Sequence, residues 1–422
     1  MNMNFSRRDF LRLSGAGVMA TSLSGWMNVL ATRAAETGLK SHKSCVLLWM
    51  DGGPSHKDTF DLKPGTPDAG EFNAIPTSVP GVQISEHFPR LAKLMDHGAI
   101  LRGMSTSEGA HARAKYNMHT GYREGQGGLV YPSIGSIAAA ELGDPKTPMP
   151  NFVSIGARSF GSGFLGPRYQ PLTISNPAKG VENLKAAVSD GEFNERIGLL
   201  EEMEVGFYKD YKASSIEAHQ TTYQRAVDLM KSKEIKAFDL SQEPEKVRGD
   251  YGNDPFGQGC LLARRLLEVG VRFVEVSLGG WDTHQDNFDK VKSLSSKVDP
   301  GMSALISDLK ARGMLDDTLI IWMGEFGRTP KINNKGAKPG RDHYPRAWST
   351  VLFGGGIKGG QVIGKTDKEG ANVEERKVST IDFMATVCTI LGIDHNKVNQ
   401  TPIGRPIRIV DKGANPVKEL LG

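Results

Sequence analysis

Short apolar runs with little alternation recur along the chain, and charged or helix-favouring segments separate them. A half-exposed strand alternates apolar and polar residues, whereas a parallel strand that is covered on both faces is apolar almost throughout. We therefore expect buried strands of a parallel sheet at residues 45–50, 99–101, 152–155, 273–278, 319–323 and 350–353.

Helical patterns lie between several of these runs and end at glycine, which is a common helix stop. Strands that alternate with helices indicate an α/β fold with a doubly wound, mostly parallel sheet flanked by helices. The sequence predicts helices at 88–97 before Gly98, at 256–269 before Gly270, from Asp299-Pro300 to about Gly313, and from Ser379 or Thr380 to Gly392.

The segment at about 181–250 has a different composition, because it is charged and favours helix, as in Glu201-Glu202-Met203-Glu204. We interpret it as a helical insertion or a lid over the sheet, rather than as a second domain with its own core. The predicted organisation is a signal at residues 1–35, followed by a single domain at 36–422 that contains this insertion.

The N-terminal segment has the parts of a cleavable export signal. Ser6-Arg7-Arg8-Asp9-Phe10-Leu11-Arg12 precedes an apolar and small-residue run, and Ala31-Thr32-Arg33-Ala34-Ala35 follows it. Paired arginines before Phe-Leu resemble the twin-arginine type of signal. The alternative is a membrane anchor, but the run is short and diluted by Ser, Gly and Thr. We expect the twin-arginine translocase as a partner during export, no stable membrane span after cleavage, and a periplasmic or secreted protein.

Charge and cysteine content bear on the possible partners and on disulfides. The chain of 422 residues has 52 Lys and Arg against 48 Asp and Glu. Most of that excess lies in the signal, so the mature part is nearly neutral, and its basic residues do not alternate with aromatic ones, which disfavours nucleic acid as a partner. The odd number and wide spacing of the cysteines predict buried free thiols at Cys45, Cys260 and Cys388.

Acidic residues follow three of the predicted strands. Asp51 ends the first run, Asp282 follows the run at 273–278, and Glu325 follows the run at 319–323, each beside glycine. Because the carboxyl ends of parallel strands meet at one edge of a sheet, we expect these carboxylates to converge there.

Converging carboxylates repel one another unless a cation or a proton neutralises them. His284 follows Asp282 by two residues, and Asp342-His343 offers a further acid and imidazole. Mixed ligands of this kind suit Zn, Mn or Fe, and an all-oxygen subset suits Ca or Mg. The alternative is that each acid caps a loop or a helix. The sequence predicts a divalent metal, such as Zn, Mn or Ca, bound by Asp51, Asp282, His284, Glu325, Asp342 and His343.

With these acids in order, the chain resembles the alkaline phosphatase and sulfatase superfamily, and within it an exported bacterial family of unknown function that is often labelled sulfatase-like. The resemblance implies that Asp51 is the first metal-binding acid. It also implies a ligand after the acid at position 325, where this chain has Phe326 instead. The residues that carry the resemblance are the blocks at 48–61, 262–266, 279–284, 324–330 and 340–343.

The resemblance places His111 at the position of the superfamily's modified Cys or Ser nucleophile, and Lys115 at that of the following Arg. His111 could act as a general acid/base or as a metal ligand, and the alternative is that it caps the helix. Ser55, Thr59 or a metal-activated water could replace the nucleophile. Lys115 and Arg328 are predicted to bind the substrate's anionic group, with Arg113 and Arg341 as less favoured candidates.

The resemblance implies a metal-dependent hydrolase of sulfate or phosphate esters, acting on a small anionic or carbohydrate ester. The alternative is a non-catalytic binding or assembly protein on the same fold that has lost the superfamily's nucleophile. A phosphomutase-like reaction is disfavoured, because it needs a phosphorylatable Ser or Thr that is not evident in the sequence.

Overall fold

An eight-stranded sheet runs through the middle of the structure, a computed structural model that describes residues 43–184, 186–211 and 214–421. Every neighbouring pair of strands is parallel, except that β11 is antiparallel to both of its neighbours. In spatial order the strands are β12 (Gln361–Ile363), β4 (Gly98–Met104), β11 (Trp348–Gly354), β8 (Thr318–Met323), β1 (Ser44–Asp51), β7 (Phe273–Gly279), β5 (Phe152–Ile155) and β6 (Leu172–Ile174).

All six predicted strands are present, and the predicted α/β class with a mostly parallel sheet is confirmed. The sequence missed β6 and β12, because each has only three residues at the border of the sheet and neither is fully buried. A strand that is short and half-exposed produces no apolar run.

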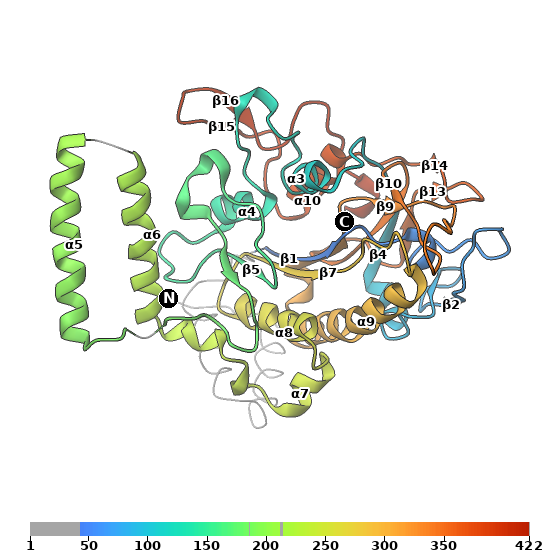
Figure 1. The fold of residues 1–422 in the computed structure, drawn as a ribbon, viewed down its shortest axis with the longest axis horizontal. Coiled ribbons are helices and arrows are strands. Elements are labelled where there is room, and N and C mark those ends of the chain that lie inside the picture. The colour runs from blue at the N-terminus through green and yellow to red at the C-terminus, as the bar shows by residue number, and fades with distance from the viewer. Residues whose placement is uncertain (1–42, 185, 212–213, 422) are drawn as a thin grey trace, which may run out of the picture. The chain divides into compact units, whose positions relative to one another are not determined.

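Helices cover both faces of the sheet (Figure 1). On one face, Cys45, Leu47 and Trp49 of β1 belong to a core cluster that includes residues of α3, α4 and α10, and α8 and α9 lie on the other face. Since both faces of β1 are buried, its sequence is apolar without alternation. The helices of the two layers are α3 (His111–Thr120), α4 (Ile134–Leu142), α8 (Pro255–Glu268), α9 (Asn287–Ala311) and α10 (Thr380–Ile390).

Two helix predictions are confirmed and two need correction. α8 and α10 lie as expected, and Ser379 caps α10 in a capping box with Asp382. The helix predicted to start at Asp299-Pro300 instead starts at Asn287, with Pro300 inside it. Packing of α9 on α8 therefore outweighs the ~3 kcal/mol cost of an internal proline. The segment predicted to be helical at 88–97 forms the 3₁₀ helix η2 (Leu91–His97).

The segment predicted as an insertion contains α5 (Asp190–Tyr211), α6 (Ser214–Lys231) and α7 (Glu245–Asp250). α5 and α6 form a helix pair to one side of the sheet rather than over it (Figure 1). α6 contacts the 3₁₀ helix η5 (Pro167–Tyr169), where Arg225 donates a hydrogen bond to the carbonyl of Arg168.

The remaining strands form four short antiparallel ribbons. They are β2 (Ala74–Pro76) with β3 (Gln83–Ser85), β9 (Gly327–Arg328) with β10 (His343–Tyr344), β13 (Lys365–Thr366) with β14 (Val373–Glu375), and β15 (Val398–Gln400) with β16 (Pro406–Arg408). Cys45, Cys260 and Cys388 are buried free thiols, as predicted. Among the described residues no helix is both long enough and apolar enough to cross a membrane. The predicted signal at 1–35 lies outside the described residues.

Candidate metal centre

The carboxyl edge of the sheet brings the ends of three central strands together. The backbone N–H of Gly52, just after β1, donates to Glu325 Oε1 at 3.1 Å, just after β8. Gly52 has a φ of +115°, and a Cβ built on it would lie 2.3 Å from the backbone nitrogen of Asp282. Only glycine allows this approach, so the sequence Asp51-Gly52 places the loop after β1 directly against the loop after β7.

Three imidazole rings converge on one carboxylate at this edge. The Nε2 atom of His111 lies 3.3 Å from Asp282 Oδ2, and those of His284 and His343 lie 3.1 and 3.3 Å from Asp282 Oδ1. Ligand atoms of His111, Asp282 and His343 all lie within 4.8 Å of one another. These four side chains are called the His₃Asp cluster below.

Each imidazole of the His₃Asp cluster is held through its other nitrogen. His111 Nδ1 lies 2.5 Å from Glu325 Oε1, His284 Nδ1 lies 2.8 Å from Asp342 Oδ1, and His343 Nδ1 lies 2.9 Å from the carbonyl oxygen of Gly109. A carbonyl and ionised carboxylates only accept hydrogen bonds, so these partners favour a proton on each Nδ1. Each Nε2 faces the carboxylate of Asp282, which also only accepts, so a second proton or a cation has to lie between them.

The resulting arrangement of lone pairs fits a cation. Two such Nε2 atoms, of His284 and His343, lie 3.0 Å apart, and Nε2 of His111 is buried without a hydrogen-bond partner. Two lone pairs cannot bond to each other, so a proton or a metal ion must satisfy them. Histidines that bind metal through Nε2 usually donate Nδ1–H to a carboxylate or a carbonyl, as all three do here.

Arg328 neutralises the carboxylate of the cluster. Its Nη1 lies 2.7 Å from Asp282 Oδ1, and its Nε and Nη2 donate to the carbonyls of Gly53 and Gly52. Burial raises the pKa of Asp282, but the charge and the hydrogen bond of Arg328 outweigh it, so the pKa lies below its ordinary value. Because the Arg328 side chain is 0% exposed, its position supports an anchoring role rather than the substrate contact that the sequence predicts.

The imidazoles have different electrostatic surroundings. The hydrogen bond to Glu325 raises the pKa of His111 above its ordinary value, although burial opposes it. Burial and then the charge of Arg328 lower the pKa of His343, which favours the neutral ring that binds a metal. The hydrogen bond from Lys335, followed by that from His284, lowers the pKa of Asp342.

One face of α3 carries a basic side chain at every fourth position, a spacing that keeps side chains on the same side of a helix. Lys115 Nζ lies 2.5 Å from Asp51 Oδ1, and His119 Nε2 lies 3.4 Å from Glu275 Oε1. The acidic partners come from three adjacent strands or their ends. His111 pairs with Glu325 just after β8, Lys115 with Asp51 of β1, and His119 with Glu275 of β7.

The predicted site residues therefore occupy three kinds of position. Those whose side chains converge are His111, Asp282, His284 and His343; those that hold an imidazole are Glu325 and Asp342; those that form a separate ion pair are Asp51 and Lys115. Asp51 and Glu325 thus lie beside the His₃Asp cluster, where the sequence predicts them among its ligands.

Three other residues that the sequence analysis singled out, Phe326, Ser55 and Thr59, are buried. Phe326 is fully buried, and its ring centroid lies 5.0 Å from that of His111 and 4.8 Å from that of His343, so it forms an apolar floor under both. Ser55 is 1% exposed, and Thr59 donates its hydroxyl to the carbonyl of Ser55. Neither hydroxyl is available as a nucleophile in this structure.

Sequence reasoning did not identify the carbonyl of Gly109, the partner of His343, because a backbone acceptor leaves no signature in residue types. The sequence also gives no sign that Glu275 is the partner of His119. The spacing of His111, Lys115 and His119 on one predicted helix could have indicated a shared face.

Residues 42–421 match a family described as protein of unknown function, DUF1501. The chain belongs to the DUF1501 family. This match confirms the resemblance to a family of unknown function that the sequence blocks indicated. No curated protein matches the chain.

This DUF1501 chain is also similar to solved structures at low identity. The crystal structure of Ps i-CgsB with k-i-k-neocarrahexaose is 12% identical, with a TM-score of 0.42 over 84% of this chain and 72% of that one. The PsFucS1 sulfatase from Pseudoalteromonas sp. is 13% identical, with a TM-score of 0.41. The match covers 93% of this chain and 76% of the sulfatase. TAB5 alkaline phosphatase is 13% identical, with a TM-score of 0.35. The match covers 83% of this chain and 99% of the phosphatase.

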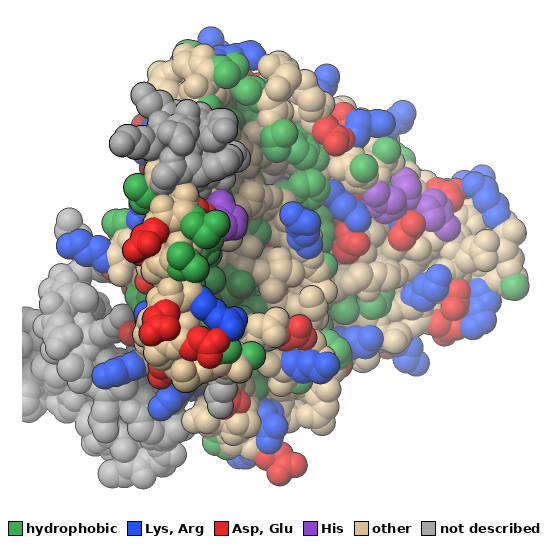
Figure 2. Space-filling view, turned by 60° about the vertical axis from the view of Figure 1, so that its left-hand side comes forward, with side chains coloured by type: hydrophobic (Ala, Val, Ile, Leu, Met, Phe, Trp, Pro, Cys, Tyr) green, Lys and Arg blue, Asp and Glu red, His purple; other side chains and the backbone are tan. Residues whose placement is uncertain are grey.

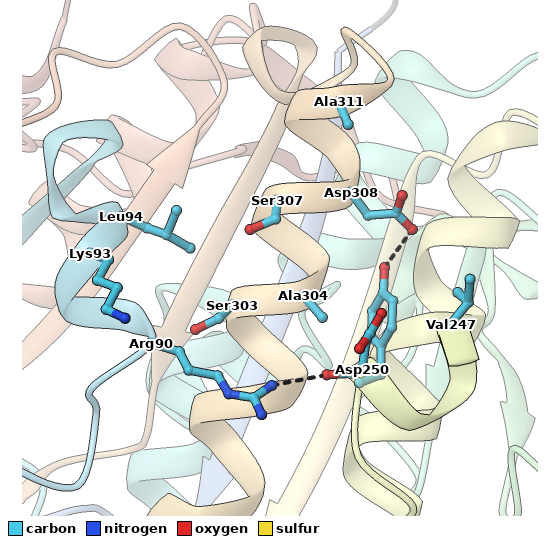
Figure 3. A pocket seen from close by; sticks show the side chains of 11 residues that line it. Arg90, Lys93, Leu94, Val247, Asp250, Ser303, Ala304, Ser307, Asp308 and Ala311 are labelled. Atoms are coloured by element: carbon cyan, nitrogen blue, oxygen red, sulfur yellow. Dashed lines mark hydrogen bonds between the residues drawn. The ribbon is translucent and has the colours of Figure 1, made fainter. Parts of the chain in front are cut away.

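The His₃Asp cluster is open to solvent and separate from two hollows of the surface. The side chains of Asp282 and His284 are 45% and 43% exposed. Figure 2 shows one face of the molecule, over which acidic and basic side chains are spread. One hollow of about 520 Å³ lies between η2, α7 and α9 (Figure 3), and one of about 1,040 Å³ lies beside α6. No residue of the cluster lines either hollow.

The buried pair of His119 and Glu275 should make stability depend on pH. Burial lowers the pKa of His119, but Glu275 more than offsets this, so the net pKa lies above the ordinary value of about 6.5. The stabilisation is therefore complete below about pH 6.5 and is lost as pH rises through the folded-state pKa. In the metal-free protein, the free energy of unfolding relative to His119→Asn should fall by up to ~1.4 kcal/mol per pH unit in that window.

Urea unfolding of both proteins between pH 5.5 and 9 would measure this difference. A difference that increases with pH would contradict the prediction, because it would mean that His119 is neutral in the folded protein.

Proposed function

We propose that this protein is an exported, metal-dependent hydrolase of sulfate or phosphate esters. The observation that carries the proposal is the convergence of three imidazole Nε2 atoms on the carboxylate of Asp282, with each Nδ1 held by an oxygen. The proposed ligands are His111, His284, His343 and Asp282. Three nitrogen donors favour Zn, Mn or Fe over Ca, which prefers oxygen ligands.

A divalent cation in such a site polarises an ester oxygen and activates water at neutral pH. The chain's own residues would orient the reaction around it. Glu325, Asp342 and the Gly109 carbonyl hold the imidazoles with Nε2 toward the site, and Arg328 keeps Asp282 ionised. These fixed partners reduce the reorganisation that binding and reaction require.

Lys115 is the proposed contact for the substrate's anionic group. Its side chain is 28% exposed, and its ammonium forms an ion pair with the carboxylate of Asp51 at the same edge of the sheet. An ammonium can bind one sulfate or phosphate oxygen while it remains paired with a carboxylate. The proposed substrate is a small anionic or carbohydrate ester, and export through the twin-arginine translocase would place the protein in the periplasm or outside the cell.

A second candidate is a non-catalytic binding or assembly protein on the same fold. The observation in its favour is that the hydroxyls of Ser55 and Thr59 are buried. The resemblance adds that His111 would replace the superfamily's nucleophile. This candidate predicts that His111→Ala leaves ligand binding intact and that no ester is hydrolysed. Turnover of an aryl sulfate or phosphate that is lost in His111→Ala would exclude it.

Metal removal tests the proposal directly. Natively purified protein should contain a divalent metal by elemental analysis. Removing that metal should lower the free energy of unfolding by about 3–4 kcal/mol relative to protein at 100–1,000 times the Kd, since the cation binds only the folded state. Aryl sulfate or phosphate turnover should be lost with the metal and return when it is restored. No bound metal, together with no loss of stability on chelation, would refute the proposal.

A further inference from the structure

A fully buried carboxylate, that of Asp58, lies outside the His₃Asp cluster. It contacts residues that hold the two loops, 282–284 and 341–343, on which three of the proposed metal ligands lie. Asp58 lies in the 3₁₀ helix η1 (His56–Asp58), in the sequence block after β1, and its side chain is 0% exposed. It accepts hydrogen bonds from the side chains of Arg341 and Asn287.

The first contact supports the loop at 341–343. Arg341 donates from Nε to Asp58 Oδ2 at 2.8 Å and from Nη2 to Asp58 Oδ1 at 3.2 Å, a two-point contact that fixes the plane of the guanidinium. Its Nη1 donates to the carbonyls of Thr329 and Pro330. The residues that follow Arg341 directly are Asp342 and His343, so this contact fixes the start of the segment that carries one proposed ligand.

The second contact supports the loop at 282–284. Asn287 Nδ2 donates to Asp58 Oδ2 at 2.9 Å, and Asn287 Oδ1 accepts from the hydroxyl of Thr283 at 2.6 Å. Thr283 is 1% exposed and lies between Asp282 and His284. The two loops also meet directly, because the backbone N–H of Arg341 donates to the carbonyl of Thr283 at 3.0 Å.

We propose that Asp58 is a positioning residue that holds Asp282, His284 and His343 in one metal-binding arrangement. The inference rests on the proposed function, because it assigns Asp58 to the support of that metal site. Arg341 contacts Asp58 from the loop at 341–343, and Asn287, the first residue of α9, connects Asp58 to the loop at 282–284 through Thr283. The single carboxylate therefore fixes one loop relative to the other. Gly70 packs closely against the carboxylate, since a Cβ built there would lie 2.9 Å from Asp58 Oδ1.

Asp58→Asn tests this role, because asparagine keeps the shape but loses the charge and one acceptor. Partners outside the ligand shell of a metal site typically change its affinity 10–100-fold, so we expect the Kd for Zn²⁺ to rise by about that factor. Asp61→Asn is the matched control. Asp61 lies three residues after Asp58 and is also buried. It pairs with Arg102, and none of its partners is on the ligand loops. Its Kd for Zn²⁺ should equal that of the wild type.

Hydrogen–deuterium exchange of the metal-free proteins gives a measurement that does not depend on metal binding. Asp58→Asn should speed exchange at both 282–284 and 341–343, whereas Asp61→Asn should not. If Asp58→Asn does not fold, Asn287→Ala replaces it, and it should speed exchange at 282–284 more than at 341–343.

The outcomes separate the two proposals. Wild-type protein that binds no divalent cation would refute the proposed function, while the exchange experiment would still decide the role of Asp58. A melting temperature lowered by Asp58→Asn, with unchanged Zn²⁺ affinity or unchanged exchange at both loops, would overturn the positioning role and leave an ordinary buried ion pair.

Discussion

Asp282→Asn should abolish useful metal binding while the protein remains folded. The carboxylate is the common neighbour of three imidazoles, and the variant removes the only negative charge among the four proposed ligands. We expect the Kd for Zn²⁺ to rise on the order of 1,000-fold, above the 10–100-fold typical of outer partners, and hydrolysis to fall with it. Asparagine can still accept the hydrogen bond from Arg328, so the metal-free protein should lose only about 1–2 kcal/mol of stability.

Calorimetric titration with Zn²⁺ and chemical unfolding of the metal-free proteins would measure both effects. Asp289→Asn is the control, since Asp289 is an exposed acid near the start of α9 that pairs with Lys338. It should change neither Zn²⁺ affinity nor activity. Wild-type affinity in Asp282→Asn would contradict the assignment of the His₃Asp cluster as the metal site.

Glu325→Gln should reduce activity on the order of 10³-fold, because it changes which nitrogen of His111 carries the proton. Glu325 Oε1 accepts from both Gly52 N–H and His111. The backbone N–H of Gly52 also lies 3.2 Å from Glu325 Oε2. In the variant, the amide oxygen at the Oε2 position accepts from Gly52, and the amide NH₂ at the Oε1 position faces His111 Nδ1. A donor at that place moves the imidazole proton to Nε2 and removes the lone pair that a metal would need.

The ¹⁵N chemical shifts of the His111 ring in metal-free protein would report the tautomer, and turnover of an aryl ester would report the loss of activity. Glu275→Gln is the matched control, because Glu275 is also a buried glutamate paired with a histidine of α3. It should alter stability but not turnover. An Nδ1-protonated His111 in Glu325→Gln would contradict this explanation.

The sheet and the edge that carries the site could be predicted from the sequence. Runs such as 45–50 are apolar because both faces of each central strand are buried, and that constraint is local enough to read directly. Asp51, Asp282 and Glu325 follow such runs, so their position at one edge follows from the parallel arrangement. The antiparallel direction of β11 could not be predicted. Its residues are buried on both faces, and an apolar run looks the same in a parallel and in an antiparallel strand.

The division of labour among the site residues could not be predicted in the same way. Whether an acid binds a metal or holds a histidine depends on a few ångströms and on hydrogen bonds between distant segments. Glu325 and Asp282 have the same sequence signature, but one is fully buried against His111 and the other is 45% exposed among three rings. Arg328 seemed suited to bind a substrate anion by its charge, and in the structure its buried guanidinium pairs with Asp282 and donates to the carbonyls of Gly52 and Gly53.

The four-residue spacing on α3 constrains how this helix can change in evolution. Successive residues of an α-helix are about 100° apart around its axis, because a turn takes 3.6 residues. An insertion of one residue between Lys115 and His119 would turn His119 away from Glu275 while His111 kept its place, so this buried acid would lose its positively charged partner and keep only the hydroxyl of Ser159. Insertions and deletions in homologous chains should therefore be excluded from 111–119 and be tolerated in the exposed turn at 123–128 that follows the helix.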